Sequence, residues 1–249
     1  MRVWHGEFRH PRLVEVYDAV CTWSREDEFF VSVVGQTPAA RVVDLGCGTG
    51  RLTLALASAG HLVTGVDPAR ASLDAARAKP GAERVRWVEG IVRSLPTAAF
   101  DVATTTAHVA QFLVADEEWR ATLHDLSRCL VPGGRLIFDS RDPSAREWER
   151  WNPRDSRETV GLGDGSTVET WVDVTSVEDS TVNFEQHYVF ADGQPLVSTA
   201  AMRFRGAEEL EGAVTRAGFV VEHIYGGWNR EPVGAGDGEL LVVACRPRE

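Results

Sequence analysis

Cysteine is scarce in this sequence and nowhere clustered. The four cysteines are far apart and form no Cys-x-x-Cys pair: Cys21, Cys47, Cys129 and Cys245. We therefore expect neither a disulfide framework nor a zinc cluster, and we expect the thiols to be reduced. Five histidines also lack metal-ligand spacing to carboxylates or to one another: His5, His10, His61, His124 and His223. The sequence therefore predicts no bound metal.

Long hydrophobic runs are missing as well. The longest run, Leu240–Cys245, is far below the roughly 18 residues that cross a bilayer. The first residues of the chain contain no apolar segment of signal-peptide length. These absences predict a cytoplasmic protein without a membrane partner.

Positive charge is outnumbered by negative charge. The 26 lysines and arginines face 37 aspartates and glutamates, which gives a net charge of −11. Such a potential repels phosphate backbones, so nucleic acid is not expected as a partner. The hydrophobic content of 43% is sufficient for a folded core, which disfavours a disordered or fibrous protein.

Apolar residues at helical spacing predict a helix over residues 11–35, ending at Gly35 ahead of Pro38. We interpret residues 1–37 as an N-terminal helical lid. The rest, residues 38–249, is interpreted as one domain interrupted by residues 155–205. The alternating hydrophobicity of that segment predicts an antiparallel β insertion, which we expect to form one wall of an acceptor pocket.

From residue 41 onward, short β-branched runs alternate with helical stretches, and this pattern is typical of an α/β fold. We expect a Rossmann-like, doubly wound sheet of seven strands, mostly parallel, with one antiparallel strand near the end of the chain. The expected strands are 41–45, 62–66, 85–88, 100–104, 135–140, 219–225 and 239–246. Helices are expected from residue 51 and over 69–78, 116–130 and 207–217, with a turn at 132–134 and a glycine-rich loop at 226–238.

The strongest motif is a predicted strand that runs into Gly46, Gly48 and Gly50 before a helix. Glycine allows the sharp turn and lets a ligand approach the backbone. A dinucleotide would place its pyrophosphate near Asp44, which would repel it, and the motif has Arg51 where a dinucleotide fingerprint has its third glycine. The acid suits a ligand whose nearby part is cationic, so a nicotinamide oxidoreductase is disfavoured.

A second acid, Asp67, ends the second predicted strand, 21 residues after Gly46. At that place its two oxygens can accept both hydroxyls of a ribose. The alternative is a solvated acid that caps a helix before Pro68.

The chain resembles class I S-adenosylmethionine-dependent methyltransferases over about residues 38–142. Their successive motifs are matched by Asp44-x-Gly46-x-Gly48-x-Gly50, Asp67, Phe100-Asp101 and Pro132-Gly133-Gly134. The resemblance implies S-adenosylmethionine as the cofactor. It implies that Asp44 organises the loop and the amino end of the methionine moiety, that the glycines pass under the cofactor and that Asp67 holds the ribose. Further expected cofactor contacts are Cys47, Pro68, Gly90, Ile91, Val92, Thr106 and His108.

Ile91 is a departure from small-molecule methyltransferases, which usually have an Asp there that bonds the adenine amine. Adenine is therefore expected on backbone groups of Ile91 and Val92. The run Asn/Asp-Pro-Pro-Tyr/Phe, common in enzymes that methylate planar amines, is absent after the fourth strand, which argues against adenine or cytosine as the acceptor.

Two histidines are candidate general bases, His108 after the fourth predicted strand and His187 in the insertion. His108 can equally pack on the cofactor. His108-x-x-Gln111 and the segment from Asp139 to Pro143 resemble elements of a set of bacterial small-molecule methyltransferases. The expected acceptor contacts are Tyr17, Trp23, Gln111, Arg141 and Trp228. Aromatic residues of the insertion, such as Phe184 and Tyr188, line either the pocket or the core.

We interpret the chain as a methyltransferase that acts on a nitrogen or oxygen nucleophile of a small molecule by direct displacement. The acceptor is expected between the N-terminal helix, the insertion and the loop 226–238. The alternatives are a non-catalytic protein that binds S-adenosylmethionine and a methyltransferase that acts on RNA or protein. The oligomeric state stays open, with a homodimer as one alternative.

Overall fold

Seven strands form the larger of two sheets in residues 5–248, the part of the chain that this computed structural model describes. Their order is β10-β11-β5-β4-β1-β2-β3, and β11 is antiparallel to both of its neighbours while the other pairs are parallel. The bounds are β1 Arg41–Leu45, β2 Leu62–Asp67, β3 Arg86–Glu89, β4 Phe100–Thr105, β5 Leu130–Arg141, β10 Val220–Tyr225 and β11 Glu239–Cys245. The predicted doubly wound sheet with one antiparallel strand is confirmed.

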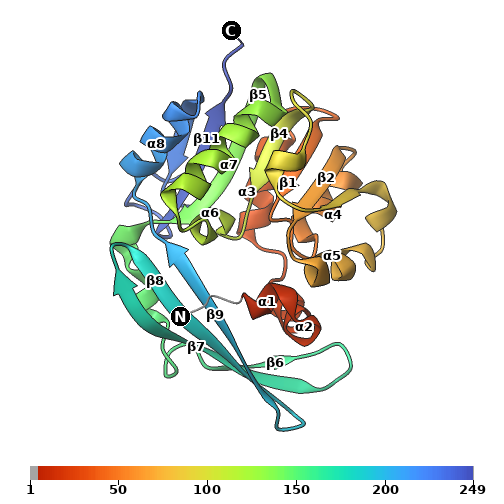
Figure 1. The fold of residues 1–249 in the computed structure, drawn as a ribbon, viewed down its shortest axis with the longest axis vertical. Coiled ribbons are helices and arrows are strands. Elements are labelled where there is room, and N and C mark those ends of the chain that lie inside the picture. Colours follow the sequence, from red (N-terminus) through yellow and green to blue (C-terminus); the bar gives the residue numbers. More distant parts are fainter. Residues whose placement is uncertain (1–4, 249) are drawn as a thin grey trace.

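Helices cover both faces of this sheet (Figure 1). They are α3 Arg25–Val34, α4 Arg51–Ser58, α5 Arg70–Arg77, α6 Val109–Phe112, α7 Asp116–Cys129 and α8 Ala207–Arg216. On one face, Phe30 of α3 and Leu56 of α4 are fully buried against the strands. On the other face, Leu123 of α7 and Val214 of α8 are fully buried. Short 3-10 turns occur at Ala82–Arg84, Val92–Ser94, Pro143–Ala145 and Glu147–Arg150.

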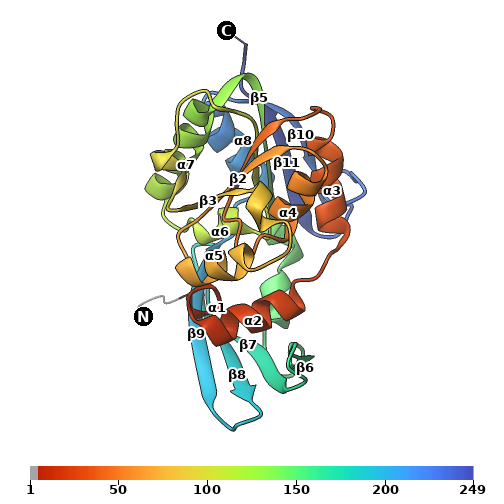
Figure 2. The ribbon, with the colours of Figure 1, turned by 90° about the vertical axis from the view of Figure 1, so that its right-hand side faces the viewer.

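The N-terminal segment contains a break that the sequence prediction missed. One helix over residues 11–35 was expected, but α1 Gly6–Arg9 and α2 Pro11–Val20 are separated from α3 by residues 21–24. The backbone N–H of Ser24 donates to the Asp27 carboxylate (2.9 Å), and Ser24 Oγ accepts from the N–H of Glu26 (3.2 Å), so a new helix begins there. As a result α3 belongs to the core, and α1 and α2 lie against α5 (Figure 2).

The second sheet has the antiparallel order β6-β7-β8-β9, as predicted for the insertion. Its strands are β6 Glu158–Gly161, β7 Thr167–Glu178, β8 Thr181–Phe190 and β9 Pro195–Arg203. Alternate side chains of β8 are buried, and Tyr188 packs with Leu13 of α2. This sheet, α1, α2 and α6 all lie at the same end of the larger sheet (Figure 1).

The expected turn at 132–134 lies inside β5, which is longer than the predicted strand. Gly133 has a φ of 83°, and the register with β4 shifts between Phe100 and Val102. The extra residues are absorbed as an irregularity of the strand rather than as a turn. No helix among residues 5–248 is long and apolar enough to cross a membrane. The expected absence of a signal peptide rests partly on residues 1–4, which lie outside the described residues.

Candidate cofactor and acceptor site

The loop between β1 and α4 contains the glycines of the sequence motif. Gly46 has a φ of 70°, and a Cβ atom added there would lie 2.6 Å from a methyl group of Val109 on α6. Gly48 has a φ of 51°, and a Cβ atom there would meet no atom within 4 Å. Positive φ values of this kind favour glycine. Close packing therefore requires glycine at position 46, whereas Gly48 leaves space on the side from which a ligand can approach.

Asp44 is a buried acid at the end of β1. Its side chain accepts hydrogen bonds from the hydroxyl groups of Thr53 (2.6 Å) and Thr104 (2.8 Å), and the residue is 1% exposed. Burial raises the pKa of Asp44 to about 6, against the lowering effect of the two hydroxyl groups. Because a buried anion is costly without a cation nearby, this place suits the positively charged part of a ligand.

Asp67, at the end of β2, is tied to the backbone on both sides. One carboxylate oxygen accepts from the N–H of Gly48 (2.9 Å) and the other from the N–H of Ala69 (2.7 Å). The bond to Ala69 is the capping bond of the alternative interpretation, and the bond to Gly48 joins the acid to the glycine loop. Each oxygen can accept a second hydrogen bond, so the structure leaves both roles available to Asp67.

A small cavity connects several of the expected cofactor residues with α2. It has a volume of about 20 Å³, enough for about one water molecule. Its lining comprises Tyr17, Cys21, Asp44, Gly46, Cys47, Thr49, Arg51, Leu52, Thr106 and Ala107. Tyr17, which was expected to contact the acceptor, therefore lines the same cavity as Asp44. The cavity itself is too small for a ligand as large as a nucleoside.

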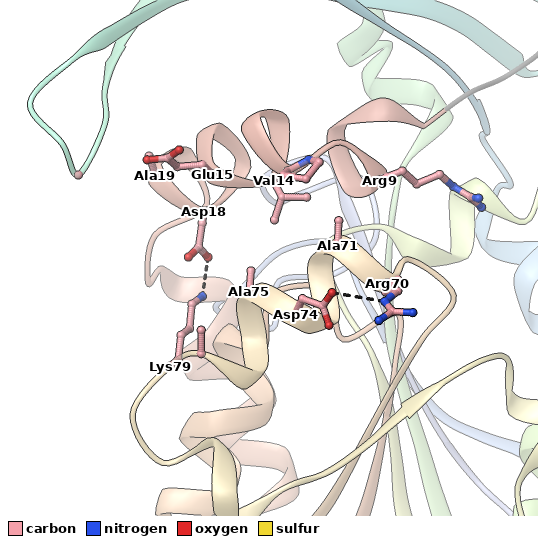
Figure 3. Close-up of a pocket in the computed structure, with 13 residues that line it drawn as sticks. Arg9, Val14, Glu15, Asp18, Ala19, Arg70, Ala71, Asp74, Ala75 and Lys79 are labelled. Carbon is pink, nitrogen blue, oxygen red and sulfur yellow. Dashed lines mark hydrogen bonds and ion pairs between the residues drawn. The ribbon is translucent and has the colours of Figure 1, made fainter.

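Polar contacts hold α2 in this position. Asp18 accepts hydrogen bonds from Lys79 Nζ (2.6 Å) and from the hydroxyl group of Thr49 (2.6 Å). Lys79 also donates to the carbonyl group of Thr49 (2.9 Å). One carboxylate on α2 is therefore connected both to the glycine loop and to the chain that follows α5 (Figure 3).

A larger hollow, of about 810 Å³, lies between α2 and α5, and Figure 3 shows residues that line it. Val14, Ala71 and Ala75 face it, with Arg9 and the ion pair between Arg70 and Asp74 at its rim. Neither the motif glycines nor Asp44 or Asp67 lines this hollow. Its size alone does not connect it with the chemistry of the site.

Beyond the cavity, three ionisable side chains meet where β4 and β5 end and β11 begins. Nε2 of His108 lies 3.0 Å from one carboxylate oxygen of Glu239 and 3.3 Å from Oδ2 of Asp139. Asp139 Oδ2 also accepts from the backbone N–H of His108 (2.9 Å). We call His108, Asp139 and Glu239 the acidic cluster.

The backbone that leads into the acidic cluster is strained. Ala107 and His108 have φ values of 55° and 61°, a conformation that costs non-glycine residues about 1–2 kcal/mol each. Two carboxylates hold it in place, since Glu26 accepts from the N–H of Ala107 (2.8 Å) and Asp139 from that of His108. Strain at a site that the surrounding structure stabilises is typical of functional sites.

Burial shifts the ionisation of all three members of the acidic cluster. It lowers the pKa of His108 to about 4, raises that of Glu239 to about 8 and also raises that of Asp139. The imidazole is therefore neutral at pH 7 and cannot balance the carboxylates. The carboxylates of this cluster need a further cation or bound protons to balance their negative charge.

Two of the expected acceptor contacts lie beside the acidic cluster. Gln111 Oε1 accepts from Nη1 of Arg141 (3.2 Å), and Arg141 Nε donates to Glu147 (2.8 Å). Gln111 is 1% exposed, and its side-chain nitrogen has no hydrogen-bond partner among the described residues.

Other expected residues lie elsewhere. His187 stacks on Trp171 of the second sheet, with ring centres 5.0 Å apart. Trp228 packs edge-on against Phe29 of α3 (6.1 Å), and Trp23 is 49% exposed between α2 and α3. The structure does not bring these side chains to the acidic cluster. Phe184 and Tyr188 are buried in hydrophobic clusters of the second sheet, which favours the core alternative for both.

The expected adenine contacts lie at the next strands. Pro68 and Gly90 directly follow β2 and β3, which are adjacent. Ile91 is 57% exposed, whereas Val92 is 2% exposed and its carbonyl group accepts from Arg128 (3.5 Å). The side chain of Val92 thus belongs to the core. A contact of this backbone with adenine stays a prediction.

Sequence reasoning did not identify the acids of the cluster as functional. Asp139 had a usable signal, because it lies at the carboxyl end of a parallel strand, as do Asp44 and Asp67. Glu239 had none, because it starts an antiparallel strand and reaches the site only through the pairing of β11 with β5.

The sequence and the structure both resemble known methyltransferases. A family whose description is "Methyltransferase domain" matches residues 42–134. The cypemycin N-terminal methyltransferase of a Streptomyces species is 30% identical over 239 residues, covering 94% of this chain and 95% of that protein. The structure of CalS10, an amino pentose methyltransferase from Micromonospora echinaspora bound to S-adenosylmethionine, is 25% identical with a TM-score of 0.68, covering 92% of this chain and 94% of CalS10. The sugar N-methyltransferase KedS8 from a Streptoalloteichus species shares the fold, with a TM-score of 0.72 at 21% identity, over 93% of this chain and 91% of KedS8.

Proposed function

The chain belongs to the class I S-adenosylmethionine-dependent methyltransferases, and we propose that it methylates a nitrogen or oxygen nucleophile of a small molecule by direct displacement. Its cofactor is S-adenosylmethionine. The cofactor, when bound, supplies an electrophilic methyl group on a positively charged sulfur atom. The chain has to bind the cofactor, orient the nucleophile about 3 Å from that methyl group and exclude water.

The residues at the carboxyl edge of the sheet fit this cofactor. Asp44 is a buried carboxylate with only hydroxyl donors, and a cationic amino group would complete its environment. Gly48 provides open space beside the loop, and Asp67 retains acceptor capacity for ribose hydroxyl groups. We assign these three residues to cofactor binding.

The observation that carries the proposal is the continuity between the two halves of the site. Ala107 lines the cavity together with Asp44, and the next residue, His108, begins the acidic cluster. A nucleophile held at the cluster would therefore lie one residue away from the cofactor residues. Two of the similar structures support a small acceptor, because CalS10 is an amino pentose methyltransferase and KedS8 is a sugar N-methyltransferase.

We expect Asp67→Ala to weaken S-adenosylmethionine binding by at least roughly tenfold, because a charged hydrogen bond is worth about 1.5–3 kcal/mol. Calorimetric titration with S-adenosylmethionine, S-adenosylhomocysteine and NADH measures this effect. Asp164→Asn, in an exposed turn of the second sheet, is the matched control and should bind normally. Equal binding by wild type and Asp67→Ala would remove Asp67 from the site.

The acceptor class is tested by methyl transfer from radiolabelled S-adenosylmethionine to small amines, small alcohols, RNA and peptides. Transfer to a small amine or alcohol supports the proposal. Transfer to RNA alone would overturn the small-molecule assignment, and tight cofactor binding without transfer to any acceptor would favour a non-catalytic binding protein.

We further expect Asp18→Asn to accelerate release of the cofactor by about threefold to tenfold. The carboxylate holds α2 over the glycine loop, and partly buried ion pairs of this kind contribute about 1 kcal/mol. Stopped-flow tryptophan fluorescence measures the rate. Asp74→Asn is the control, because the partners of Asp74 among residues 5–248 are Arg70 and Arg77 of its own helix. Identical release rates for the two variants would show that α2 does not gate the site.

A further inference from the structure

We propose that the methyl acceptor is an amine that binds as an ammonium ion at the acidic cluster, and that Glu239 takes its proton before methyl transfer. This inference rests on the proposed function of the site and narrows its acceptor from nitrogen or oxygen to an amine.

The hydrogen-bond donors of the acidic cluster are too few for its acceptors. Nε2 of His108 lies within 3.0–3.3 Å of both Glu239 oxygens and of Asp139 Oδ2, yet a neutral imidazole can donate at most one proton from that nitrogen. The other oxygen of Asp139 is buried without a partner among the described residues. At the accessible oxygens of Glu239, an ammonium group brings three N–H donors, whereas a hydroxyl group brings one.

The charges around Glu239 also favour a cation or bound protons. The groups that face it are His108, Asp139, Arg141, Glu147, Glu26 and Asp237. Arg141 is the one permanent cation among these groups, and Glu147 already pairs with it at 2.8 Å. Glu26 pairs with Arg51 (3.3 Å) and Asp237 with Arg25 (3.5 Å), so the charge left to balance is that of Glu239 and Asp139 in their ionised forms. Such a charge is stable only with a cation or with bound protons.

Exposure separates the roles of the three residues. The side chains of His108 and Glu239 keep 13% and 11% of their surface, while the Asp139 side chain has none. A ligand can therefore touch His108 and Glu239, but not Asp139. Asp139 acts as a positioning residue, since it accepts from the backbone N–H of His108 and holds that residue in its strained conformation.

The proton transfer balances as follows. The ammonium ion binds Glu239 in its ionised form. One ammonium proton then passes to a carboxylate oxygen of Glu239, and the nitrogen recovers its lone pair. That pair forms a bond to the methyl carbon while the carbon–sulfur bond breaks and its electrons stay on sulfur. The methylated ammonium ion leaves, and Glu239 returns its proton to water. An acid with an ordinary pKa would be a poor base for an ammonium ion, and the raised pKa of Glu239 supports this role.

The closing experiment first tests cation binding without methyl transfer. Benzylammonium and benzyl alcohol are titrated separately into the full chain at pH 7, and the imidazole NMR signals are followed, with the His108 signal assigned by its loss in His108→Asn. We expect benzylammonium, but not benzyl alcohol, to shift the His108 signal. Glu239→Gln should remove the shift. Glu222→Gln should retain the shift, because Glu222 of β10 pairs with Arg135 of β5, away from the cluster.

Several outcomes would overturn the inference. An equal response to benzyl alcohol would do so, as would a shift that persists in Glu239→Gln. Tight binding of Mn²⁺ that broadens the His108 signal and excludes benzylammonium would reassign the cluster to a metal. These results do not depend on cofactor binding, so failure here is distinguishable from failure of the methyltransferase proposal.

The second part of the experiment uses an amine that accepts methyl groups. Glu239→Gln should lower kcat by about 10²–10⁴-fold at pH 7, and the loss should shrink as pH rises and the free amine replaces the ammonium ion. A variant whose KM alone changes, or whose loss is independent of pH, would show that Glu239 only binds the acceptor. An acceptor that proves to be an alcohol would overturn the inference directly.

Discussion

Replacing Asp44 with asparagine should raise the thermal stability of the free protein and weaken its affinity for S-adenosylmethionine by roughly tenfold to a hundredfold. The ionised carboxyl group is buried, and its pKa is raised to about 6 by that burial. The rise of about 2 pKa units, at about 1.4 kcal/mol per unit, means that removing the charge should stabilise the fold by up to about 3 kcal/mol at pH 8. The same change removes the negative charge that faces the cationic cofactor.

The pH dependence follows from the direction of this shift. The folded pKa of Asp44 lies above the ordinary value of 3.8, so the stability linked to protonation is fully present below 3.8 and is lost as pH rises through 6. The advantage of Asp44→Asn should therefore be absent near pH 4, grow between pH 4 and 6, and be complete above about pH 6. Cofactor affinity of the wild type should fall below pH 6, where Asp44 becomes protonated.

Differential scanning calorimetry and calorimetric titration over pH 4–8 measure both effects. Asp101→Asn is the matched control, because Asp101 pairs with Arg41, which lowers the pKa of Asp101. That variant should lose a little stability and keep its cofactor affinity. A destabilised Asp44→Asn that still binds the cofactor would contradict the assignment of Asp44.

Gly46→Ala should destabilise the fold by about 3 kcal/mol and abolish cofactor binding at ordinary concentrations. Its φ of 70° costs an alanine about 1–2 kcal/mol, and the new Cβ would lie 2.6 Å from a methyl group of Val109. To avoid this clash, either the glycine loop or the start of α6 would have to move, and His108 is the residue directly before α6. For a chain of this size, we expect the Tm to fall by about 6–12 °C.

Two variants separate the causes of this effect. Gly193→Ala changes a glycine with a φ of 78° in a hairpin turn where a Cβ meets nothing within 4 Å, so it should show only the conformational cost. The double variant Gly46→Ala/Val109→Ala should recover part of the lost stability by removing the clash. If Gly46→Ala is no less stable than Gly193→Ala, the packing of Val109 against the loop is not a constraint.

Much of the cofactor half of the site could be predicted from the sequence, because its signals are local. A buried strand, a glycine turn and a helix follow one another within residues 41–58, and the acid at the end of the next strand has a characteristic spacing. The same local patterns predicted most of the strands. The prediction of one helix over residues 11–35 was wrong. Apolar spacing continues through residues 21–24, whereas the hydrogen bonds of Ser24 and Asp27 begin a new helix there.

The acceptor half could be predicted only in part. His108, Gln111 and Arg141 were candidates from their positions at strand ends, and the structure brings them to one place. His187, Trp23 and Trp228 are residues of similar chemistry, and their positions depend on how the second sheet and the loops pack. No short-range pattern contains that information.

By itself, the sequence predicted the fold class and located the glycine loop, because strand and turn patterns depend on neighbours along the chain, and its family resemblance implied the cofactor. The tertiary structure alone decided that Glu239 meets His108. The two residues are 131 positions apart, and they meet because β11 pairs antiparallel with β5 in a register that puts Glu239 opposite Arg141. Burial at that junction, which no local pattern records, is also what shifts the pKa values of the cluster.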